Sequence, residues 1–249
     1  VAFGVLSDVH LGRRGDQDTL LKALAYFRDN GADGVLIAGD IANTGRIEQI
    51  ERAASCFWRT SPDGKAPDGR HVEQLWVYGN HDVCGWGWHK GKDEAFLKST
   101  AINFGNNRAE VWERIFHEPY RPIWAKTVKG YTFIGAHWIA DCCLGWEETG
   151  GPQTAPWFAA NGSSLDVSKP FFYLQHPPLK NTCHGDWVWG HDTGAVTEAL
   201  SKFPNAVALS GHSHASIGDE RAIWQGAFTG VSIPSLSYTT VPGGYDNGS

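Results

Sequence analysis

The sequence predicts an α/β protein with a largely parallel sheet, because strand-like and helix-like segments alternate along it. Short apolar runs at residues 3–6, 35–38 and 75–78 have the length and flanking residues of buried strands. Segments with apolar residues at helical spacing lie between them, over about residues 18–31 and 46–59. Strand–helix–strand alternation of this kind is typical of βαβ units.

The middle of the chain is less regular. Residues 108–116 have the pattern of a helix, and residues 131–134 have the pattern of a strand. Residues 145–168 hold four Gly, two Pro and a pair of Ser, which predicts a long loop within the domain.

The alternation resumes after this predicted loop. We expect a strand at residues 171–175, a helix at residues 193–203 and a further strand at residues 206–209. Short β-prone runs between residues 222 and 240 predict an antiparallel edge to the sheet.

Composition narrows the class of protein. Hydrophobic residues make up 41% of the 249 residues and charged residues 19%, as in an ordinary globular domain. No run approaches the ~18 apolar residues that a membrane-spanning helix needs. The net charge of −6 disfavours a long nucleic-acid footprint, which needs a basic face, but leaves a small anionic substrate open. None of the five Cys has C-x-x-C spacing, so we expect no cysteine zinc site.

Polar side chains of the kind that bind metals follow five of the predicted strands. In open α/β sheets, ligands bind beyond the carboxyl ends of the strands, so we expect these side chains to converge on one edge. They are Asp8 and His10, then Asp40, then Asn80 and His81, then His176, and finally His212 and His214.

The residue types indicate which metals would bind. Two Asp, one Asn and four His supply oxygen and imidazole ligands without thiolate, a set that suits Mn, Fe or Zn better than Mg or Ca. In extended backbone, Asp-x-His and His-x-His would each place both side chains on one side. The Gly residues before Asp40, Asn80 and His212 would allow the chain to turn tightly there.

The order of these motifs resembles that of the calcineurin-like metallophosphoesterase superfamily, which includes the purple acid phosphatases. The resemblance is carried by Asp8-x-His10, Gly39-Asp40, Gly79-Asn80-His81-Asp82, His176 and Gly211-His212-x-His214. It implies a four-layer αββα sandwich of two mixed β-sheets flanked by helices, in one domain over residues 1–249. A further C-terminal region stays open.

The resemblance also implies how the motifs divide between two metal ions. Asp8, His10 and His214 would bind the first ion, Asn80, His176 and His212 the second, and Asp40 would bridge both. Metal-bound hydroxide would attack a phosphomonoester or phosphodiester, and His81 would protonate the leaving oxygen. Every ligand position of the family pattern is present. No Tyr adjoins Gly39-Asp40, so we expect no purple charge-transfer colour.

Two other functions compete with this interpretation. A non-catalytic scaffold or binding module on the same fold would typically lack part of the ligand set or His81, and here all are present. A nuclease is disfavoured by the acidic balance without being excluded. The oligomeric state is left open.

Several residues near the motifs have a less definite role. His176 is the least secure ligand, because a loop His packed beside two prolines would give the same pattern. Asp82 is expected to support the ligands or accept hydrogen bonds in a turn, and Asn43 to line the pocket or form a turn. Trp187 and Trp189 are expected to contact substrate, with a cap that touches no substrate as the alternative.

The remaining histidines and tryptophans are interpreted as structural. His71, His89, His117 and His137 are expected to be surface or packed residues, with Trp86, Trp88 and Trp138 as hydrophobic cover. Residues 223–226 and 235–238 are similar to those of bacterial calcineurin-like phosphoesterases, many of them exported. We therefore expect a bacterial enzyme located outside the cytoplasm.

Overall fold

A computed structural model describes most of the chain. The residues outside the description are 13–16, 85–94, 96, 97, 99, 101–106, 140–150, 186, 187, 189–191, 242, 243 and 247–249. For residues 84, 151, 152, 241 and 244–246 only the backbone is described. Trp86, Trp88, His89, Trp187 and Trp189 therefore lie outside the described residues, and the predictions made for them stay predictions.

The first half of the chain forms three strands with helices after each of them. The elements are β1 (Phe3–Leu6), α1 (Gln17–Asp29), β2 (Gly34–Ala38), α2 (Ile47–Thr60), β3 (Glu73–Val77), α3 (Asn80–Cys84) and α5 (Arg108–Phe116). These bounds agree within a few residues with the predicted strands and helices. The alternation read from the sequence is confirmed here.

The second half supplies the longer sheet. Its elements are β4 (Ile123–Val128), β5 (Tyr131–Ala136), α6 (Gly151–Asn161), β6 (Phe171–Leu174), α8 (Ala195–Leu200), β7 (Ala206–Ser210), β8 (Ile223–Gln225), β9 (Thr229–Ser232), β10 (Thr239–Val241) and β11 (Gly244–Asp246). Short 3₁₀ helices occur at Pro62–Gly64, Gly162–Ser164 and Glu220–Ala222.

The strands form two principal sheets rather than one. The first is parallel throughout, in the order β1-β2-β3, and the second has six strands in the order β4-β5-β6-β7-β9-β8. The second sheet is mixed, because β5, β6, β7 and β9 run parallel while β4 and β8 are antiparallel to their neighbours. The antiparallel edge expected after residue 222 is β8. The β10–β11 hairpin is separate.

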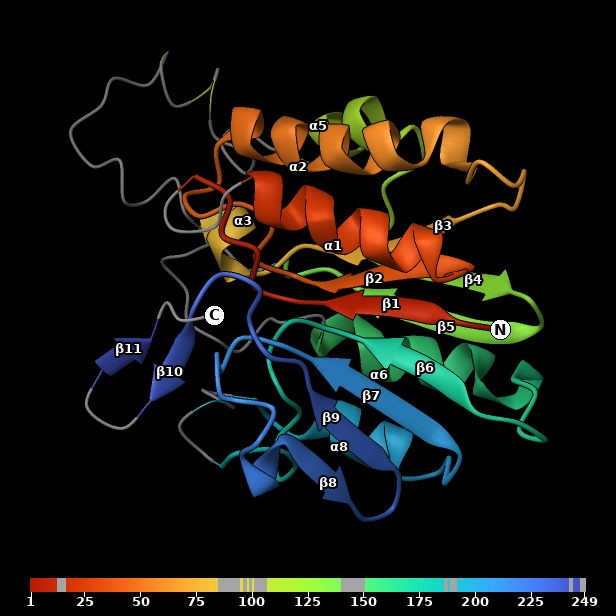
Figure 1. Cartoon of the computed structure of the whole chain (residues 1–249). Helices are drawn as coiled ribbons and strands as arrows, with labels where there is room; N and C mark the ends of the chain where they lie inside the picture. The colour runs from red at the N-terminus through yellow and green to blue at the C-terminus, as the bar shows by residue number, and fades with distance from the viewer. Residues whose placement is uncertain are drawn as a thin grey trace.

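Four layers follow from the way the elements pack. Helices α1, α2 and α5 cover one face of the first sheet, the two sheets face each other, and α6 and α8 cover the outer face of the second sheet (Figure 1). The buried apolar residues divide into three clusters, one for each space between layers. The expected αββα sandwich is confirmed.

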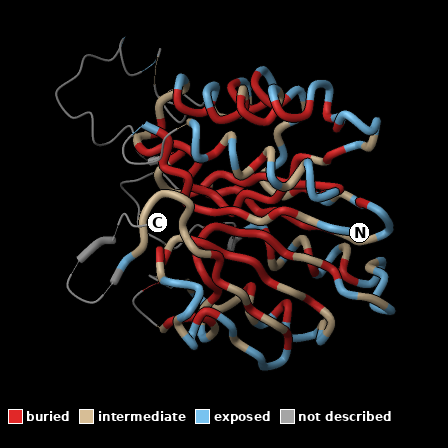
Figure 2. The backbone as a smooth tube through the Cα atoms, viewed as in Figure 1, coloured by how far each residue is buried: buried red, intermediate tan, exposed pale blue. Residues whose placement is uncertain are grey.

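Successive residues of a strand point to opposite faces of its sheet. Because both faces are buried here, the strands are apolar at nearly every position. In β2, Val35 and Ile37 pack toward α1 and α2, whereas Leu36 and Ala38 pack toward the second sheet. Both faces of each sheet are therefore covered, and the tube in Figure 2 is buried through the middle of the molecule.

Several elements were not foreseen, among them α3, β4 and α6. The predicted loop at residues 145–168 contains α6, and β4 forms a hairpin with β5. In α6, Phe158 is buried with Ala155 and Trp157 packed beside it, so contact with the second sheet outweighs the low helix propensity of Gly and Pro. Helix α8 is shorter than the predicted 193–203, since Gly194 lies before its first residue with φ of 88°.

Other expectations concern cysteines and membranes. The thiols of Cys56 and Cys183 are buried. Within the described part of the chain, no helix combines the length and apolar composition that crossing a membrane would require.

Candidate metal centre

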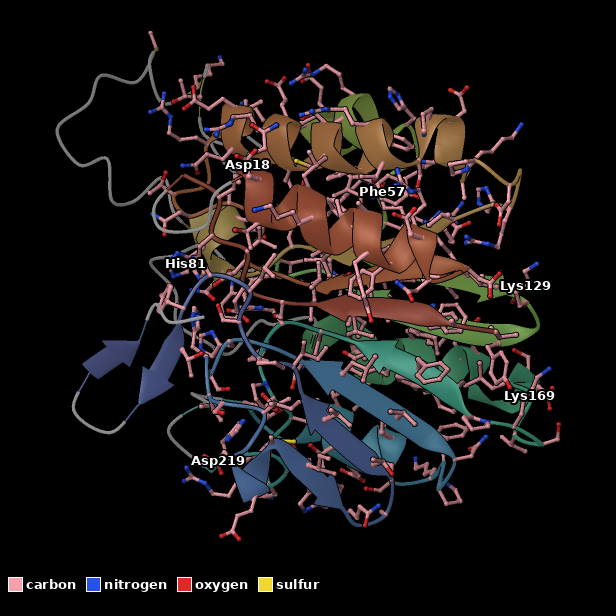
Figure 3. All side chains as sticks on the ribbon, viewed as in Figure 1. Asp18, Phe57, His81, Lys129, Lys169 and Asp219 are labelled. Atoms are coloured by element: carbon pink, nitrogen blue, oxygen red, sulfur yellow. The ribbon has the colours of Figure 1, made fainter. Side chains whose placement is uncertain are left out.

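The predicted site residues lie together at the carboxyl ends of strands from both sheets. Strands β1, β2, β6 and β7 all point toward the left side of Figure 1, and His81 is labelled at that side in Figure 3. Asp8 and His10 follow β1, Asp40 follows β2, and His81 follows β3. The site residues therefore converge as expected from parallel strands, but the strands that carry them belong to both of the facing sheets.

One group of side chains consists of Asp8, His10, Asp40 and His214, all buried, with ligand-type atoms within 4.8 Å of one another. The Nε2 atoms of His10 and His214 are 3.0 Å apart. The Nε2 of His214 also lies 3.0 Å from Asp8 Oδ1, and that of His10 lies 3.6 Å from Asp40 Oδ2. This group can hold one metal ion.

A second group consists of Asp40, His176 and His212 and obeys the same 4.8 Å limit. The Nε2 of His176 is 3.1 Å from Asp40 Oδ2 and 3.3 Å from His212 Nδ1. Asp40 belongs to both groups, so two ions bound there would share its carboxylate. His176, the least secure of the predicted ligands, lies inside this group.

Asn80 lies beside these groups at the start of α3. Its Oδ1 is buried without a hydrogen-bond partner among the described residues. The backbone N–H of the next residue, His81, donates to Asp40 Oδ1 at 2.8 Å, which fixes the start of α3 against the shared carboxylate.

The backbone at the site differs from the extended form that the sequence suggested. Asp8, His10, Asp40, His212 and His214 all have positive φ, between 47° and 69°. Side chains of Asp-x-His and His-x-His are therefore presented by left-handed turns, not by the two-residue period of a strand. Left-handed backbone at non-Gly residues is strained, and such strain is concentrated at functional sites.

The three Gly residues before the ligands serve two different needs. Gly39 has φ of 86°, the conformation expected of a tight turn. Gly79 and Gly211 instead allow close approach. A Cβ on Gly79 would overlap the carboxylate and backbone nitrogen of Asp40, and one on Gly211 would overlap Ser7 Oγ and Asp8 Oδ2.

Three imidazoles of the site are oriented by backbone carbonyls. The Nδ1 of His176 donates to Ala38 O at 2.6 Å, and the Nδ1 of His214 donates to Tyr238 O at 3.0 Å. Each ring thus turns its Nε2 toward the carboxylates, as metal-ligating histidines commonly do. The Nδ1 of His81 donates to the carbonyl of Asn43 at 2.8 Å.

Asp82 joins two of the ligand-bearing loops. Its carboxylate accepts from the backbone N–H groups of Ile41 and Ala42, at 3.2 and 2.6 Å, and of Gly79, at 2.8 Å. Burial, and then the negative charge of Asp40, raise the pKa of Asp82 to about 7. Asp82 therefore supports the segments that carry Asp40 and Asn80, in line with the role expected for it.

The two aspartates remain ionised despite their burial. Burial by itself would raise the pKa of Asp8, but His214, His10 and His176 outweigh it and hold that pKa well below the usual range. The pKa of Asp40 is likewise lowered, because His176 and His81 outweigh the effect of burial. The site therefore presents two negative charges at neutral pH.

The pKa values of the histidines are shifted in both directions. Burial acts to lower the pKa of His176, yet Asp40 and Asp8 outweigh it and raise that pKa to about 9. Burial, followed by repulsion from His176, lowers the pKa of His212 to about 3. Burial also lowers the pKa of His81, with Asp40 partly opposing the shift. These shifts describe the protein without bound metal.

The arrangement fits a pair of metal ions. Imidazole nitrogens that face each other at 3.0 and 3.3 Å repel unless a proton or a cation lies between them. The Oδ1 of Asn80, which has no hydrogen-bond partner in the described part of the chain, adds an oxygen donor. Carboxylate, amide and imidazole donors together suit Mn, Fe or Zn.

Two ligand groups that share one aspartate, on the edge of a two-sheet αββα sandwich, define the class of two-metal phosphoesterases. The chain belongs to the calcineurin-like phosphoesterase family, whose sequence model matches residues 1–216. The motifs from Asp8 to His214 all fall within that match.

Solved structures of low sequence identity share the fold. A dimetal phosphatase from Danio rerio superposes with a TM-score of 0.58 at 14% identity, covering 98% of this chain and 90% of that one. A purple acid phosphatase from yellow lupin superposes with a TM-score of 0.55 at 16% identity, covering 85% of this chain and 37% of the lupin chain. No curated protein sequence matches the chain.

Two residues near the site were missed by sequence reasoning. The Tyr238 ring lies against His214, with ring centroids 4.2 Å apart, and its carbonyl orients the same imidazole. His137, interpreted as surface or packed, is fully buried, and its Nδ1 accepts from the backbone N–H of Tyr78 at 3.0 Å. His71 and His117 are exposed. His137 belongs to no recognisable motif, and the resemblance over residues 235–238 gave Tyr238 no role at the site.

Proposed function

We propose that this protein hydrolyses a small phosphomonoester or phosphodiester at a pair of metal ions. The observation that supports the proposal is that Asp40 belongs to both groups of ligand atoms. A structural site for a single ion would need only one group. The family shared with other phosphoesterases supports the same reaction class.

The ligands divide between the two ions as follows. Asp8, His10 and His214 would hold the first ion, Asn80, His176 and His212 would hold the second, and Asp40 would serve both. The metal pair, when bound, supplies a nucleophile activated near neutral pH and offsets negative charge on the phosphate. Manganese, iron and zinc all suit this donor set, and elemental analysis distinguishes them.

His81 is the proposed general acid. Its Nδ1 donates to the Asn43 carbonyl, so Nε2 would be the ring atom that gives a proton to the leaving oxygen. This Nε2 lies 3.9 Å from Asp40 Oδ2, next to the shared carboxylate. The side chain is 19% exposed, which leaves it accessible to a substrate.

The acidic net charge favours a small substrate. The net charge of −6 disfavours binding along a nucleic acid, so a small ester is preferred over a nuclease substrate. Trp187 and Trp189 are proposed as substrate contacts from sequence alone. A location outside the cytoplasm is likewise a proposal, which rests on the resemblance to exported bacterial enzymes.

A substrate panel with metal analysis tests the proposal. The purified protein should contain about two metal ions per chain and should hydrolyse aryl phosphates and aryl phosphodiesters. Chelation and Asp40→Asn should each abolish turnover, and added metal should restore only the chelated wild type. A protein that holds both metals but hydrolyses no ester of the panel would instead be a binding module.

A further inference from the structure

A second cavity lies at the opposite end of β3 from the metal centre. Its volume is about 650 Å³, within the usual range of about 300–1,000 Å³ for small-molecule sites. It is bounded by the end of α2, the segment at residues 62–64, the start of β3 and the end of α5. Gln74 lies near the amino end of β3, whereas Asn80 and His81 follow its carboxyl end.

The floor and one wall of the cavity are aromatic. Phe57 and Phe116 are buried beneath it, and Trp58 stands beside them. The indole Nε1 of Trp58 donates to Ile115 O at 3.2 Å, which fixes the plane of the ring. The ring of His117 lies 5.4 Å from that of Trp58, centroid to centroid. These rings offer flat apolar surface to a ring-shaped ligand. Figure 3 labels Phe57 well away from His81.

Gln74 places an unused polar group in this apolar wall. It lines the cavity and is only 6% exposed, and its Nε2 has no hydrogen-bond partner among the described residues. A buried amide left without a partner costs stability, about 1–3 kcal/mol in typical cases. The nitrogen itself is covered, so the amide would have to turn toward the cavity before a ligand could accept from it and remove the cost. Gln74 is therefore a second indication of a site, independent of the cavity's shape.

The charges around the cavity disfavour an anionic ligand. Asp63, Glu73 and Glu118 line it, and Lys126 lies between the last two, 3.0 Å from Glu73 and 2.5 Å from Glu118. Burial would raise the pKa of Glu73, but Lys126 and His71 outweigh it and lower that pKa, so the carboxylate stays ionised. Three carboxylates against one ammonium leave a negative rim, unsuited to a phosphate.

We propose that this cavity binds a heteroaromatic amine, at a site separate from the metal centre. The ring would pack on Phe57, Phe116 and Trp58. A ring nitrogen would accept from Gln74 Nε2, and the amine hydrogens would be donated to the Gln74 amide oxygen or to Asp63. Glutamine pairs in this two-point manner with adenine, where a ring nitrogen and an exocyclic amine lie side by side.

Adenine is the probe for the test, with benzoate as an anionic ring of similar breadth. The metal-loaded protein should bind adenine with a dissociation constant of about 1 mM or lower, a reasonable value for so small a ligand. Benzoate should not bind. In ¹H–¹⁵N NMR spectra, adenine should shift the indole N–H of Trp58 and the side-chain amide of Gln74 and leave the His81 signals unchanged.

Gln74→Leu removes the amide while keeping similar volume, and Gln225→Leu makes the same change at an exposed position on β8. We expect Gln74→Leu to weaken adenine binding at least tenfold without lowering the melting temperature, because it also removes an unpartnered polar group. Gln225→Leu should bind as wild type does. Adenine shifts located at the metal centre, equal binding to Gln74→Leu, or no binding below about 10 mM would each overturn the proposal. The NMR signals that adenine shifts in the wild-type protein test the proposal even if Gln74→Leu fails to fold.

Discussion

The Nε2 atoms of His10 and His214 face each other at 3.0 Å, although 204 positions separate the two residues in the chain. Because His214 Nδ1 donates to Tyr238 O, its Nε2 turns inward without a hydrogen unless the ring is protonated. Two inward-facing nitrogens beside Asp8 and Asp40 require a cation or a proton between them. In the metal-free protein, Asp8 outweighs burial and raises the pKa of His214, which favours a proton there.

Metal binding should therefore release protons. The pKa of His176 is raised to about 9, so its ring is protonated at pH 7 and must lose that proton to bind a metal. We expect the apparent affinity for Zn²⁺ or Mn²⁺ to rise up to about tenfold per pH unit between pH 7 and 9. Calorimetry in buffers of different ionisation enthalpy measures the protons released. A binding heat that is independent of the buffer would contradict this.

The same pKa predicts how the metal-free protein responds to pH. A folded-state pKa of about 9, above the unfolded value near 6.5, means that His176 stabilises the fold fully below pH ~6.5. That contribution should be lost as the pH rises toward 9. Urea unfolding of chelated protein measures it, and metal-loaded protein serves as the comparison because its His176 carries no proton.

Replacing His81 should slow the reaction most for esters with poor leaving groups. The carbonyl of Asn43 holds the ring so that Nε2 can deliver a proton, and His81→Ala removes that proton donor. We expect a loss of about 10²–10⁴ in kcat on an alkyl phosphate and a smaller loss on an activated aryl phosphate. Normal turnover of the alkyl ester would remove His81 from the mechanism. The exposed His117→Ala is the matched control and should turn over as wild type does.

Gly79 should not tolerate a side chain, although its backbone conformation would allow one. A Cβ there would overlap the Asp40 carboxylate and backbone nitrogen, so Gly79→Ala must displace the shared ligand. We expect a loss of about 1–3 kcal/mol in unfolding free energy and loss of bound metal. Gly218→Ala, whose Cβ would meet only Ser216 Oγ at 3.5 Å, is the control. Full metal content in Gly79→Ala would show that the loop can shift without harm.

The sequence predicted the ligand-bearing edge well because two signals agreed. Apolar runs marked β1, β2, β3, β6 and β7, and polar side chains followed each of them. Parallel strands share one carboxyl edge, so residues as distant as Asp8 and His214 were expected to meet. The four-layer arrangement required the family resemblance. The alternation of strands and helices by itself predicted a single parallel sheet. An apolar strand indicates that both of its faces are buried, but not whether a helix or a second sheet covers each face.

The structural features that the sequence did not predict depend on contacts between distant segments. Helix α6 is stabilised by Phe158 packing on the second sheet, which its Gly and Pro content conceals. The left-handed positions themselves, such as His10 and His212, are not Gly, so the sequence did not reveal their conformation. His137 has no motif around it, yet it holds the backbone of Tyr78 just before Asn80. Trp187, Trp189 and the export of the protein stay predictions.

His137 should make the protein sensitive to mild acid. Burial, and then Arg108 and Lys126, lower its pKa to about 3. Since the unfolded ring has a pKa near 6.5, the unfolded state binds the proton more tightly, and stability falls as the pH drops below ~6.5. The slope is about 1.4 kcal/mol per pH unit, and the total loss approaches about 5 kcal/mol near pH 3.

His137→Asn tests this because Asn can keep an acceptor for the Tyr78 N–H without a titrating ring. The variant should be less stable at pH 7.5, since the smaller side chain leaves space beside Trp112 and Tyr120. Its unfolding free energy should nevertheless fall less steeply between pH 6.5 and 5, by about 1.4 kcal/mol per pH unit. Urea unfolding of chelated protein at several pH values measures both effects. His117→Asn, a left-handed position where Asn is well tolerated, should keep the wild-type slope. An unchanged slope in His137→Asn would mean that this buried ring does not titrate on unfolding, and the acid sensitivity would then belong to His212, whose pKa burial and His176 also lower to about 3.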